Sequence, residues 1–214
     1  MTADPAPADG QRNELLSLGT ATLYEASRSE CFLSATLRPV WAGATLVGTA
    51  LPVRAAPGDN LPLHLALEAA SRGDVLVIDA GGTAYGYWGE VLTVAAQHRG
   101  VRGLVIDGGV RDTNRLAALG FPVFSSSVAL RGTVKHDPGS VGTPLMFGST
   151  PVARGDIVVA DSDGIVVLPA GRFTDILAAA RERQRKEDGF LDRIRAGELT
   201  VDIYGFSRTG SLPR

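Results

Sequence analysis

Two short runs of apolar, mostly β-branched residues constrain the fold of this chain more than any other feature. Residues 75–78 and 104–106 each precede an aspartate and a group of glycines. Runs of this length and composition are typical of buried strands, and glycines that follow a strand are typical of loops. The intervening segments have helical spacing, which predicts alternating strands and helices over residues 74–79, 90–99, 102–107, 113–119 and 121–125. This alternation favours a parallel sheet with right-handed crossovers.

The segments that precede this region predict a helix and one or two strands. Residues 12–27 carry apolar residues at helical spacing, and Gly19 can divide that helix into two. Residues 37–53 are rich in Val, Thr and Ala, which suits strands interrupted at Gly43 or Gly48.

The segments that follow it have a different composition. Glycines are frequent after residue 128, and the apolar runs 157–160 and 165–168 flank a polar turn, which predicts an antiparallel hairpin. Residues 172–196 predict a charged helix that Gly189 can break, and a helix this polar typically lies in solvent or reaches over a neighbouring subunit. We therefore predict the α/β class, with a central parallel sheet packed on an antiparallel sheet and flanking helices.

The composition limits the size, the compartment and the partners. With 214 residues and 44% hydrophobic content, the chain can form one domain, expected over residues 11–205 after a frayed tail of residues 1–10. A formal net charge of -2 gives no basic surface for nucleic acid. The single cysteine, Cys31, excludes an intrachain disulfide and fits a reducing cytoplasm. Because no leader is recognisable and no apolar run reaches about 18 residues, we expect a cytoplasmic protein that binds no membrane.

The first candidate for a functional site is the start of the helix predicted at Glu90. The free backbone N–H groups of Val91 and Leu92, together with the positive end of the helix dipole, can receive a small anion such as a carboxylate. Gly89 precedes this helix, and the aromatic residues 87–88 could form a wall of the site. Acids are also favoured in the first turn of any helix, so Glu90 can equally be a structural residue.

The second candidate is the pair Arg111–Asp112, which follows the second apolar run. Arginine offers a planar fork for a carboxylate or an enolate oxygen. Asp112 can hold Mg²⁺ or Mn²⁺, because Mg²⁺ needs few protein carboxylates and keeps several waters. The structural alternative is that Asp112 is the N-cap of the helix 113–119. Since the carboxyl ends of parallel strands share one edge of a sheet, this pair and Glu90 are expected to meet.

Other motifs have less support. The glycines after Asp79 lack the GxGxxG spacing, and neither GxxxxGK[ST] nor GxSxG occurs. His64 lies on the apolar face of a helix predicted over residues 61–71, where we expect a buried imidazole rather than a ligand. Residues 161–164 resemble part of a calcium loop but lack its distal acid, so we expect a hairpin turn.

Several stretches together resemble the RraA-like family, which includes class II 4-hydroxy-4-methyl-2-oxoglutarate aldolases, oxaloacetate decarboxylases and regulators of ribonuclease activity A. They are LGTATLYEAS, PGDN, GDVLVIDAGG, WGEVLTVAAQHRGVRGLVIDGGVRD, LGFPVF and ARGDIVVADSDGIVVLP. The resemblance covers about residues 15–205. It implies a swivelling β/β/α-type sandwich that assembles as a homotrimer, or as a hexamer of two trimers, with active sites at subunit clefts.

The resemblance also implies roles for the two strand ends. Asp112 would anchor the divalent metal, Mg²⁺ or Mn²⁺. Arg111 would hold the oxygen that becomes the enolate. The backbone after Gly89, at Val91 and Leu92, would receive the carboxylate of a small 2-oxo acid.

Two acids complete the implied site. Glu90 stands where the characterised aldolases have an aspartate, and it would orient Arg111 or the water shell of the metal. The aldolases also use an acid from the adjacent subunit, for which Glu187 on the late charged helix is the candidate. This chemistry requires no Schiff-base lysine, and neither Lys135 nor Lys186 shows a sign of burial in the sequence.

From this resemblance we expect a metal-dependent lyase that cleaves a carbon–carbon bond of a 2-oxo acid through a pyruvate enolate. One alternative is a non-catalytic regulator that binds a ribonuclease or a helicase. The other is an enzyme that forms an enolate from a larger substrate, which the aromatic residues of the segment TAYGYW suggest.

Overall fold

The structure of the chain is a computed structural model that describes residues 7–206. The predicted tail lies partly outside these residues, at positions 1–6, whereas Asp9 and Gly10 already belong to the first helix. The helices are α1 (Asp9–Ser27), α2 (Leu61–Ala69), α3 (Glu90–Arg99), α4 (Thr113–Ala118), α5 (Phe173–Arg195) and α6 (Thr200–Ile203), with a 3-10 turn at Ala170–Arg172. The strands are β1 (Arg38–Pro39), β2 (Leu46–Arg54), β3 (Asp74–Trp88), β4 (Gly103–Val110), β5 (Val123–Val128), β6 (Ser140–Val141), β7 (Leu145–Phe147), β8 (Thr150–Val152), β9 (Ile157–Ala160) and β10 (Ile165–Leu168).

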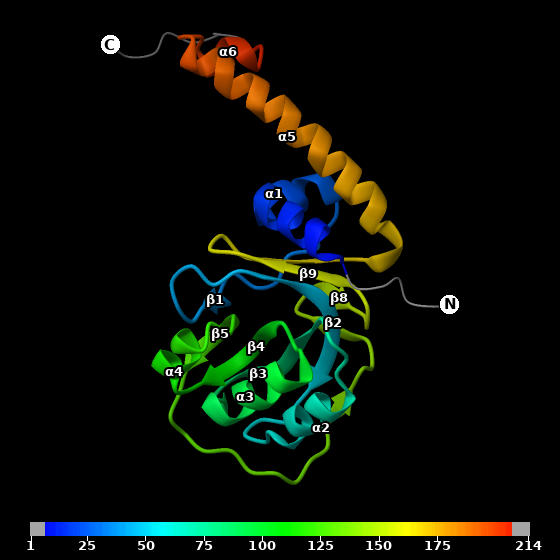
Figure 1. The fold of residues 1–214 in the computed structure, drawn as a ribbon, viewed down its shortest axis with the longest axis vertical. Helices are drawn as coiled ribbons and strands as arrows, with labels where there is room; N and C mark the ends of the chain where they lie inside the picture. Colours follow the sequence, from blue (N-terminus) through cyan, green and yellow to red (C-terminus); the bar gives the residue numbers. More distant parts are fainter. Residues whose placement is uncertain (1–6, 207–214) are drawn as a thin grey trace.

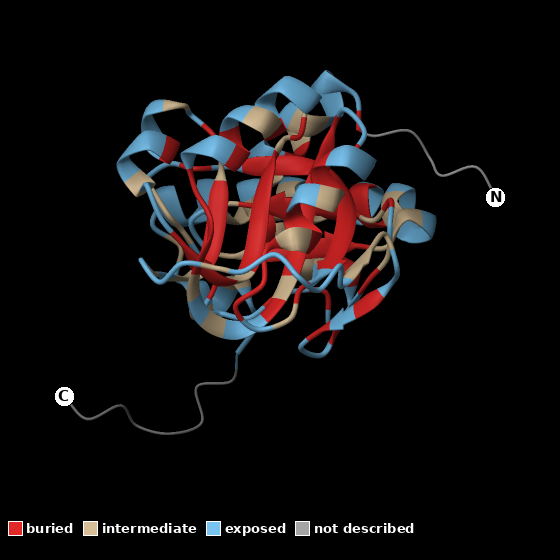
Figure 2. Ribbon diagram, turned by 90° about the horizontal axis from the view of Figure 1, so that it is seen from below, coloured by how far each residue is buried: buried red, intermediate tan, exposed pale blue. Residues whose placement is uncertain are grey.

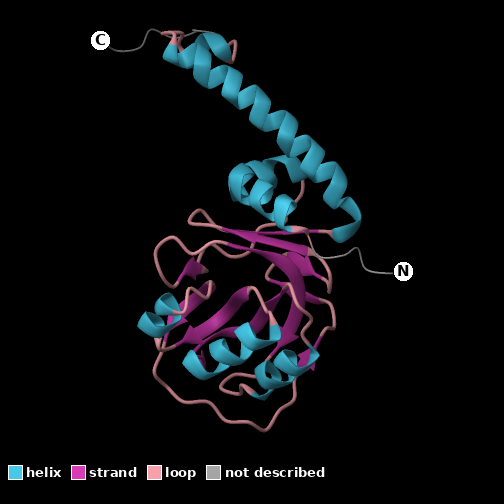
Figure 3. Cartoon of the chain, in the orientation of Figure 1, coloured by secondary structure: helices cyan, strands magenta, loops and turns pink. Residues whose placement is uncertain are grey.

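The main sheet is mixed and curled (Figures 1 and 3). Its strands follow the order β1-β5-β4-β3-β2-β9-β10, and β6 pairs with the C-terminal end of β2. The strands β2, β3, β4 and β5 run parallel, whereas β9 and β10 form the predicted antiparallel hairpin. Because β2 pairs with both β3 and β9, the parallel and antiparallel regions belong to one hydrogen-bonded sheet. A separate small sheet consists of β7 and β8. The predicted α/β class is confirmed.

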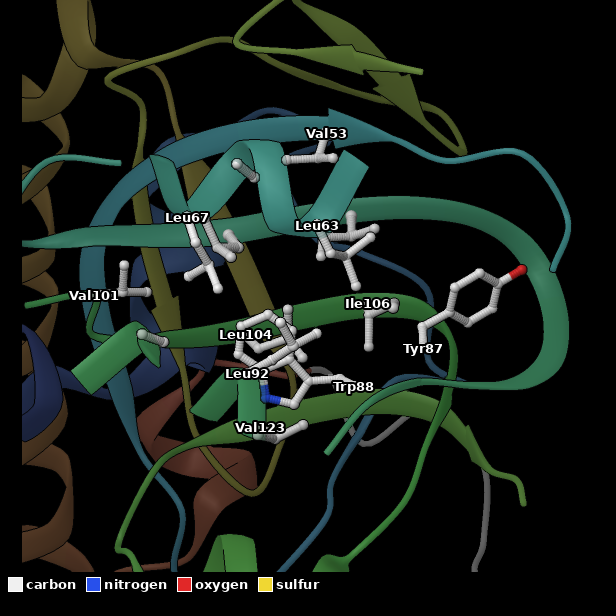
Figure 4. Packing of buried hydrophobic residues seen from close by; sticks show 14 of the residues in the cluster. Val53, Leu63, Leu67, Tyr87, Trp88, Leu92, Val101, Leu104, Ile106 and Val123 are labelled. Atoms are coloured by element: carbon white, nitrogen blue, oxygen red, sulfur yellow. The ribbon is translucent and has the colours of Figure 1, made fainter. Parts of the chain in front are cut away.

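The curl places the parallel strands between two packed layers. Side chains alternate along β3, as a strand requires. Leu76 and Ile78 belong to the cluster that contains Leu63 of α2 and Leu92 of α3, the two helices that cover it (Figure 4). Val75 and Val77 pack against Val158 and its neighbours on β9 and β10. The helices α1 and α5 cover the opposite face of the β9–β10 hairpin. Both faces of the central strands are therefore buried, which explains their continuous apolar sequence (Figure 2).

The prediction that the first central strand ends in a glycine loop is wrong. β3 continues from Asp74 to Trp88 and passes through Gly81 and Gly82, which have φ of 65° and 68°. Its pairing with β4 is irregular on either side of Thr83. Glycine tolerates this left-handed backbone, so the strand bulges and continues instead of ending. As a consequence, β3 delivers the chain directly to α3.

Of the two alternative interruptions predicted within residues 37–53, the one at Gly43 is confirmed and the one at Gly48 is wrong. β2 runs through Gly48 without a break, and the turn lies earlier, where Gly43 has φ of 83°. A Cβ at Gly48 would overlap the carbonyl oxygen of Gly73. Glycine at this position therefore permits close packing of neighbouring segments rather than a turn.

The helix α1 is divided at Gly19, as its sequence predicted. Gly19 has φ 77° and ψ 158°, a backbone conformation that residues with a side chain rarely adopt. The helix resumes at Thr20, whose backbone N–H and hydroxyl both donate to the Asp161 carboxylate, at 2.8 and 2.7 Å. Asp161 lies in the hairpin turn between β9 and β10, which is the turn predicted for residues 161–164. The turn thus caps the second half of α1.

The helix α5 is unbroken, so the interruption predicted at Gly189 is wrong. Its first turns bury Ile176, Leu177 and Ala180 against the body of the protein, and its second half projects away from that body (Figure 1). Among the helices described for residues 7–206, none has the length and apolarity needed to cross a membrane.

We expect Asp161→Ala to lower the free energy of unfolding by about 2–4 kcal/mol. It removes two hydrogen bonds from Thr20 that cap the helix and two from the backbone of Asp163 and Gly164 within the turn, each worth about 1 kcal/mol. Urea denaturation followed by circular dichroism measures the change. Asp163→Ala, in the same turn but exposed, is the matched control and should change stability by less than about 0.5 kcal/mol. Equal losses in the two variants would contradict the capping role of Asp161.

Candidate active site

Two strand ends meet at one edge of the sheet. β3 ends at Trp88 and β4 ends at Val110, and these two residues are paired between the strands. The backbone N–H of Arg111 donates to the carbonyl of Trp88 at 2.9 Å. The turns that begin α3 and α4 are therefore adjacent, as expected for the carboxyl ends of parallel strands.

Asp112 connects these two turns. It occupies the N-cap position of α4 with φ 58° and ψ 32°, a left-handed conformation that is uncommon for a residue with a side chain. Its carboxylate makes no capping hydrogen bond to α4. Instead, Asp112 Oδ2 accepts the backbone N–H of Glu90, the first residue of α3, at 3.0 Å. The N-cap alternative is thus correct in position, but the carboxylate caps the neighbouring helix.

Gly89 provides the space that the Asp112 carboxylate occupies. A Cβ on Gly89 would overlap Asp112 Oδ2 and would lie 3.2 Å from Arg111 Cγ. The backbone of Gly89 is extended, with φ of −163°, so conformational freedom is not the reason for a glycine here. The reason is the close approach of the two turns.

A cavity of about 240 Å³ opens at this junction. Five residues predicted from the sequence line it together: Gly89, Val91, Leu92, Arg111 and Asp112. A second hollow, of about 490 Å³, shares Arg111 and Asp112 with the first and is also lined by Glu90. The convergence expected from the sequence is therefore present.

The first turn of α3 presents free donors to the cavity. The N–H of Glu90 is taken by Asp112, and the N–H of Thr93 donates to the carbonyl of Gly89 at 3.1 Å. Between them lie Val91 and Leu92, whose N–H groups have no acceptor within the helix. Both residues line the cavity, so a small anion can find hydrogen-bond donors there together with the positive end of the helix dipole.

Within residues 7–206, neither of the two predicted acids forms a salt bridge with Arg111. The half-exposed side chain of Glu90 lies 4.0 Å from Arg115, measured from Oε2 to Nε, and a pair this long and exposed contributes little stability. Glu187 is on α5, where it pairs with Arg183 at 2.7 Å. It is not among the residues that line the cavity of its own chain. A role for Glu187 in the site of an adjacent subunit stays a prediction.

Three further polar residues line the cavity and were not placed there by the sequence: Asn60, His64 and Lys135. The prediction that His64 is buried is wrong, because Leu63 and Leu67 occupy the buried face of α2 and leave the His64 ring exposed. The sequence contained a signal that Asn60 and His64 lie together. Asn60 and His64 are spaced by four residues at the start of a helix, and this spacing places both on one face.

Cationic side chains predominate in the cavity, where Arg111 and Lys135 face the single carboxylate of Asp112. Loss of water to the surrounding cavity walls and, next, the positive charge of Lys135 lower the pKa of the otherwise exposed His64 below its ordinary value of 6.5. The imidazole is therefore neutral at pH 7. Asn60 donates through Nδ2 to the carbonyl of Tyr87 at 3.1 Å, and its buried Oδ1 has no partner within residues 7–206.

The two aromatic residues expected to wall the anion site are structural anchors. Both line the cavity, yet both side chains are almost fully buried (Figure 4). The Tyr87 hydroxyl accepts the N–H of Gly58 at 2.6 Å, and the Trp88 indole N–H donates to Thr93 Oγ1 at 2.7 Å. These bonds fix the end of β3 and, with it, the position of Gly89.

The side chains of the cavity suit an open site for a hard divalent cation such as Mg²⁺ better than a closed site with three or four protein ligands. Within residues 7–206, no group of three or more His, Cys, Asp and Glu side chains is arranged to hold a metal. Zinc usually requires three or four such ligands, whereas Mg²⁺ often takes one or two carboxylates and completes its shell with water and substrate. Asp112 is partly exposed and lines both hollows, so it is the residue that could hold such an ion.

Known proteins are similar to this chain in sequence and in fold. A model of the RraA-like family, described as Aldolase/RraA, matches residues 20–167. The chain belongs to the RraA-like family. A relative from Halalkalibacterium halodurans, named "Putative 4-hydroxy-4-methyl-2-oxoglutarate aldolase", is 34% identical over 173 residues, which cover 80% of this chain and 82% of the relative.

Solved structures of RraA proteins confirm the fold. RraAS2 of Streptomyces coelicolor, described as an unusual member of the RNase ES inhibitor RraA protein family, superposes with a TM-score of 0.75 at 28% identity and covers 85% of this chain and 96% of its own. The RNA-processing inhibitor RraA from Thermus thermophilis gives a TM-score of 0.65 at 27% identity. The match covers 71% of this chain and 92% of the Thermus chain. In this chain α5 and α6 follow the residues that match the RraA-like family.

We expect Gly89→Ala to displace the Asp112 carboxylate and break its hydrogen bond to Glu90, which should lower the free energy of unfolding by about 1–2 kcal/mol. Gly132→Ala is the matched control, because a Cβ there meets no atom within 4 Å. Thermal unfolding and a crystal structure of each variant measure the effect. A Gly89→Ala protein with unchanged stability and an unmoved Asp112 would contradict the packing argument.

Proposed function

We propose that this RraA-like protein is a divalent-metal-dependent lyase that cleaves a carbon–carbon bond of a small 2-oxo acid through a pyruvate enolate. The observation that carries the proposal is the shared cavity of Arg111, Asp112 and the N-terminus of α3. The name of the H. halodurans relative supports aldolase chemistry. Aldol cleavage of 4-hydroxy-4-methyl-2-oxoglutarate and decarboxylation of oxaloacetate leave the same enolate, so one site can serve either reaction.

In this proposal the start of α3 binds the carboxylate of the 2-oxo acid. The N–H groups of Val91 and Leu92 donate to it, and the helix dipole adds a favourable electrostatic term. Asp112 occupies the preceding N–H, of Glu90, so the substrate carboxylate is directed one position further into the helix. Binding at fixed backbone donors orients the 2-oxo group toward Arg111.

Arg111 stabilises the enolate oxygen as negative charge develops on it. Its backbone is held by the carbonyl of Trp88, and its side chain packs beside Gly86, where a Cβ would lie 3.1 Å from Arg111 Cδ. A guanidinium stays charged at any working pH, and a positioned cation contributes most where charge appears. A Mg²⁺ or Mn²⁺ ion held by Asp112 would supply Lewis-acid polarisation of the 2-oxo group.

Aldol cleavage also needs a group that accepts the proton of the 4-hydroxyl. Glu90, at the shared edge of the second hollow, is the candidate within the chain, and Glu187 of an adjacent subunit is the candidate across an interface. A homotrimer or hexamer is supported by the rim of the site, where Val91, Val128 and Leu130 are 81%, 63% and 86% exposed. Apolar side chains gathered in this way suit a subunit contact.

The proposal predicts that the purified protein releases pyruvate from oxaloacetate or from 4-hydroxy-4-methyl-2-oxoglutarate when Mg²⁺ or Mn²⁺ is present, and that a chelator abolishes the release. We expect Arg111→Ala to lower kcat by about 10²–10³-fold, because it removes a group that stabilises the developing charge. Arg38→Ala, an exposed arginine on β1, should retain activity. A coupled lactate dehydrogenase assay measures the pyruvate.

No pyruvate from either acid, with metal binding confirmed by calorimetry, would contradict the lyase proposal. The result would then favour a second candidate, inhibition of RNA processing, which the descriptions of the Streptomyces and Thermus structures support. Arg111→Ala also separates the two functions. It should abolish lyase activity, whereas a regulator that binds a ribonuclease or a helicase through another surface would be unaffected.

A further inference from the structure

A long segment that follows β5 contributes Lys135 to the cavity. We call residues 129–139 the strap; it crosses from β5 to β6 along the edge where α2 and α3 begin (Figure 1). The N–H of Ala129 donates to the carbonyl of Val110, and the carbonyl of Arg131 accepts the N–H of Gly86 at 2.7 Å. The strap contains no helix and only one isolated bridge, so its path depends on individual contacts of this kind with distant parts of the chain.

Both neighbours of Lys135 in the strap are held in place. On one side, the N–H of Val134 donates to the carbonyl of Gly58 at 2.9 Å, and the carbonyl of Val134 accepts the N–H of Asn60 at 3.1 Å. On the other side, the strap is held by a side chain. Asp59, which is 3% exposed, accepts the backbone N–H groups of His136 and Asp137 on Oδ2, at 2.7 and 2.8 Å. Its Oδ1 accepts the N–H of Leu61 at 2.9 Å, at the start of α2. A buried carboxylate therefore ties the residues that follow Lys135 to the start of the helix that carries His64.

The charge of Asp59 is needed for this arrangement. Burial alone would raise the pKa of Asp59, but the N–H groups of Asp137, Leu61 and His136 outweigh burial and hold the pKa below its ordinary value of 3.8. An ionised carboxylate offers acceptors on both oxygens. The isosteric amide offers only one oxygen and would turn an NH₂ group toward a backbone donor. Asp59→Asn should therefore loosen the strap with little change in side-chain volume.

The ammonium group that the strap delivers has no counter-ion in the described structure. Within residues 7–206, the Lys135 side chain makes no salt bridge or hydrogen bond. Its positive charge contributes to lowering the pKa of the neighbouring His64. Arg111 and the N-terminus of α3 already account for one carboxylate in the cavity. The cavity, at about 240 Å³, lies below the range of about 300–1,000 Å³ typical of drug-sized ligands, so a second anionic group of a small acid would lie near Lys135.

We propose that Asp59 is a positioning residue: by holding His136 and Asp137, it fixes Lys135 over the cavity, where the lysine receives the second carboxylate of a dicarboxylic 2-oxo acid. Asp59 itself does not line the cavity, so its effect on the substrate passes through the strap. This inference rests on the proposed binding of a 2-oxo acid at α3. It identifies Lys135 as the residue that selects a dicarboxylic acid over pyruvate.

Calorimetric affinities for 2-oxoglutarate and pyruvate, with Mg²⁺ present, test the proposal without requiring turnover. The wild type should bind 2-oxoglutarate more tightly, because only that acid carries a second carboxylate. Asp59→Asn and Lys135→Met should each weaken 2-oxoglutarate binding about tenfold and pyruvate binding less than about twofold, which corresponds to one charge-assisted contact. The double variant should be no weaker than Lys135→Met alone, because both changes remove the same contact.

The strap itself is tested by hydrogen exchange. The amides of His136 and Asp137 should exchange at least about tenfold faster in Asp59→Asn than in the wild type. Asp156→Asn is the matched control, because Asp156 also accepts two backbone N–H groups, those of Ala153 and Ala170, but lies outside this cavity.

Any one of three results would overturn the proposal. They are an equal loss of affinity for 2-oxoglutarate and pyruvate in Asp59→Asn, additive losses of affinity in the double variant, and unchanged hydrogen exchange of the His136 and Asp137 amides. A wild type that binds 2-oxoglutarate no more tightly than pyruvate would overturn the role of Lys135. These outcomes are separate from failure of the lyase proposal, which shows as absence of pyruvate release.

Discussion

The hydrogen bond from the Glu90 backbone to the Asp112 carboxylate joins the two halves of the site. It links the first N–H of α3 to the turn after β4, and it requires a glycine at position 89 and a left-handed backbone at Asp112. Both requirements are costly for the fold, since an aspartate in this conformation is strained and a glycine adds conformational entropy to the unfolded chain. The bond leaves Val91, Leu92 and Arg111 facing one cavity, and the proposed lyase activity depends on that arrangement.

The sequence predicted the fold where local pattern and tertiary structure agree. The alternation of apolar runs and helical segments identified the parallel strands, and Gly19 identified the division of α1. The prediction failed where glycine has more than one use. Gly81 and Gly82 allow a bulged strand to continue, and Gly48 permits close packing. A glycine can therefore indicate a close approach of two segments or a bulge as well as a turn.

The candidate site was predictable in its backbone elements and less so in its side chains. Arg111 and Asp112 directly follow a strand, so the edge at which they lie follows from topology. Lys135 could not be placed in this way, because it lies on an irregular segment whose path is set by long-range contacts with residues 58–60. Asp112 shows a related limit. Its N-cap position follows from the sequence, but which helix its carboxylate caps is decided by the neighbouring strand.

A crystal structure of the protein with Mn²⁺ and pyruvate tests the central claim most directly, since the anomalous signal of manganese locates the ion. The account predicts manganese at the Asp112 carboxylate, the pyruvate carboxylate on the N–H groups of Val91 and Leu92, and the 2-oxo oxygen beside the Arg111 guanidinium. Pyruvate bound elsewhere, or manganese bound away from Asp112 with this cavity empty, would contradict it.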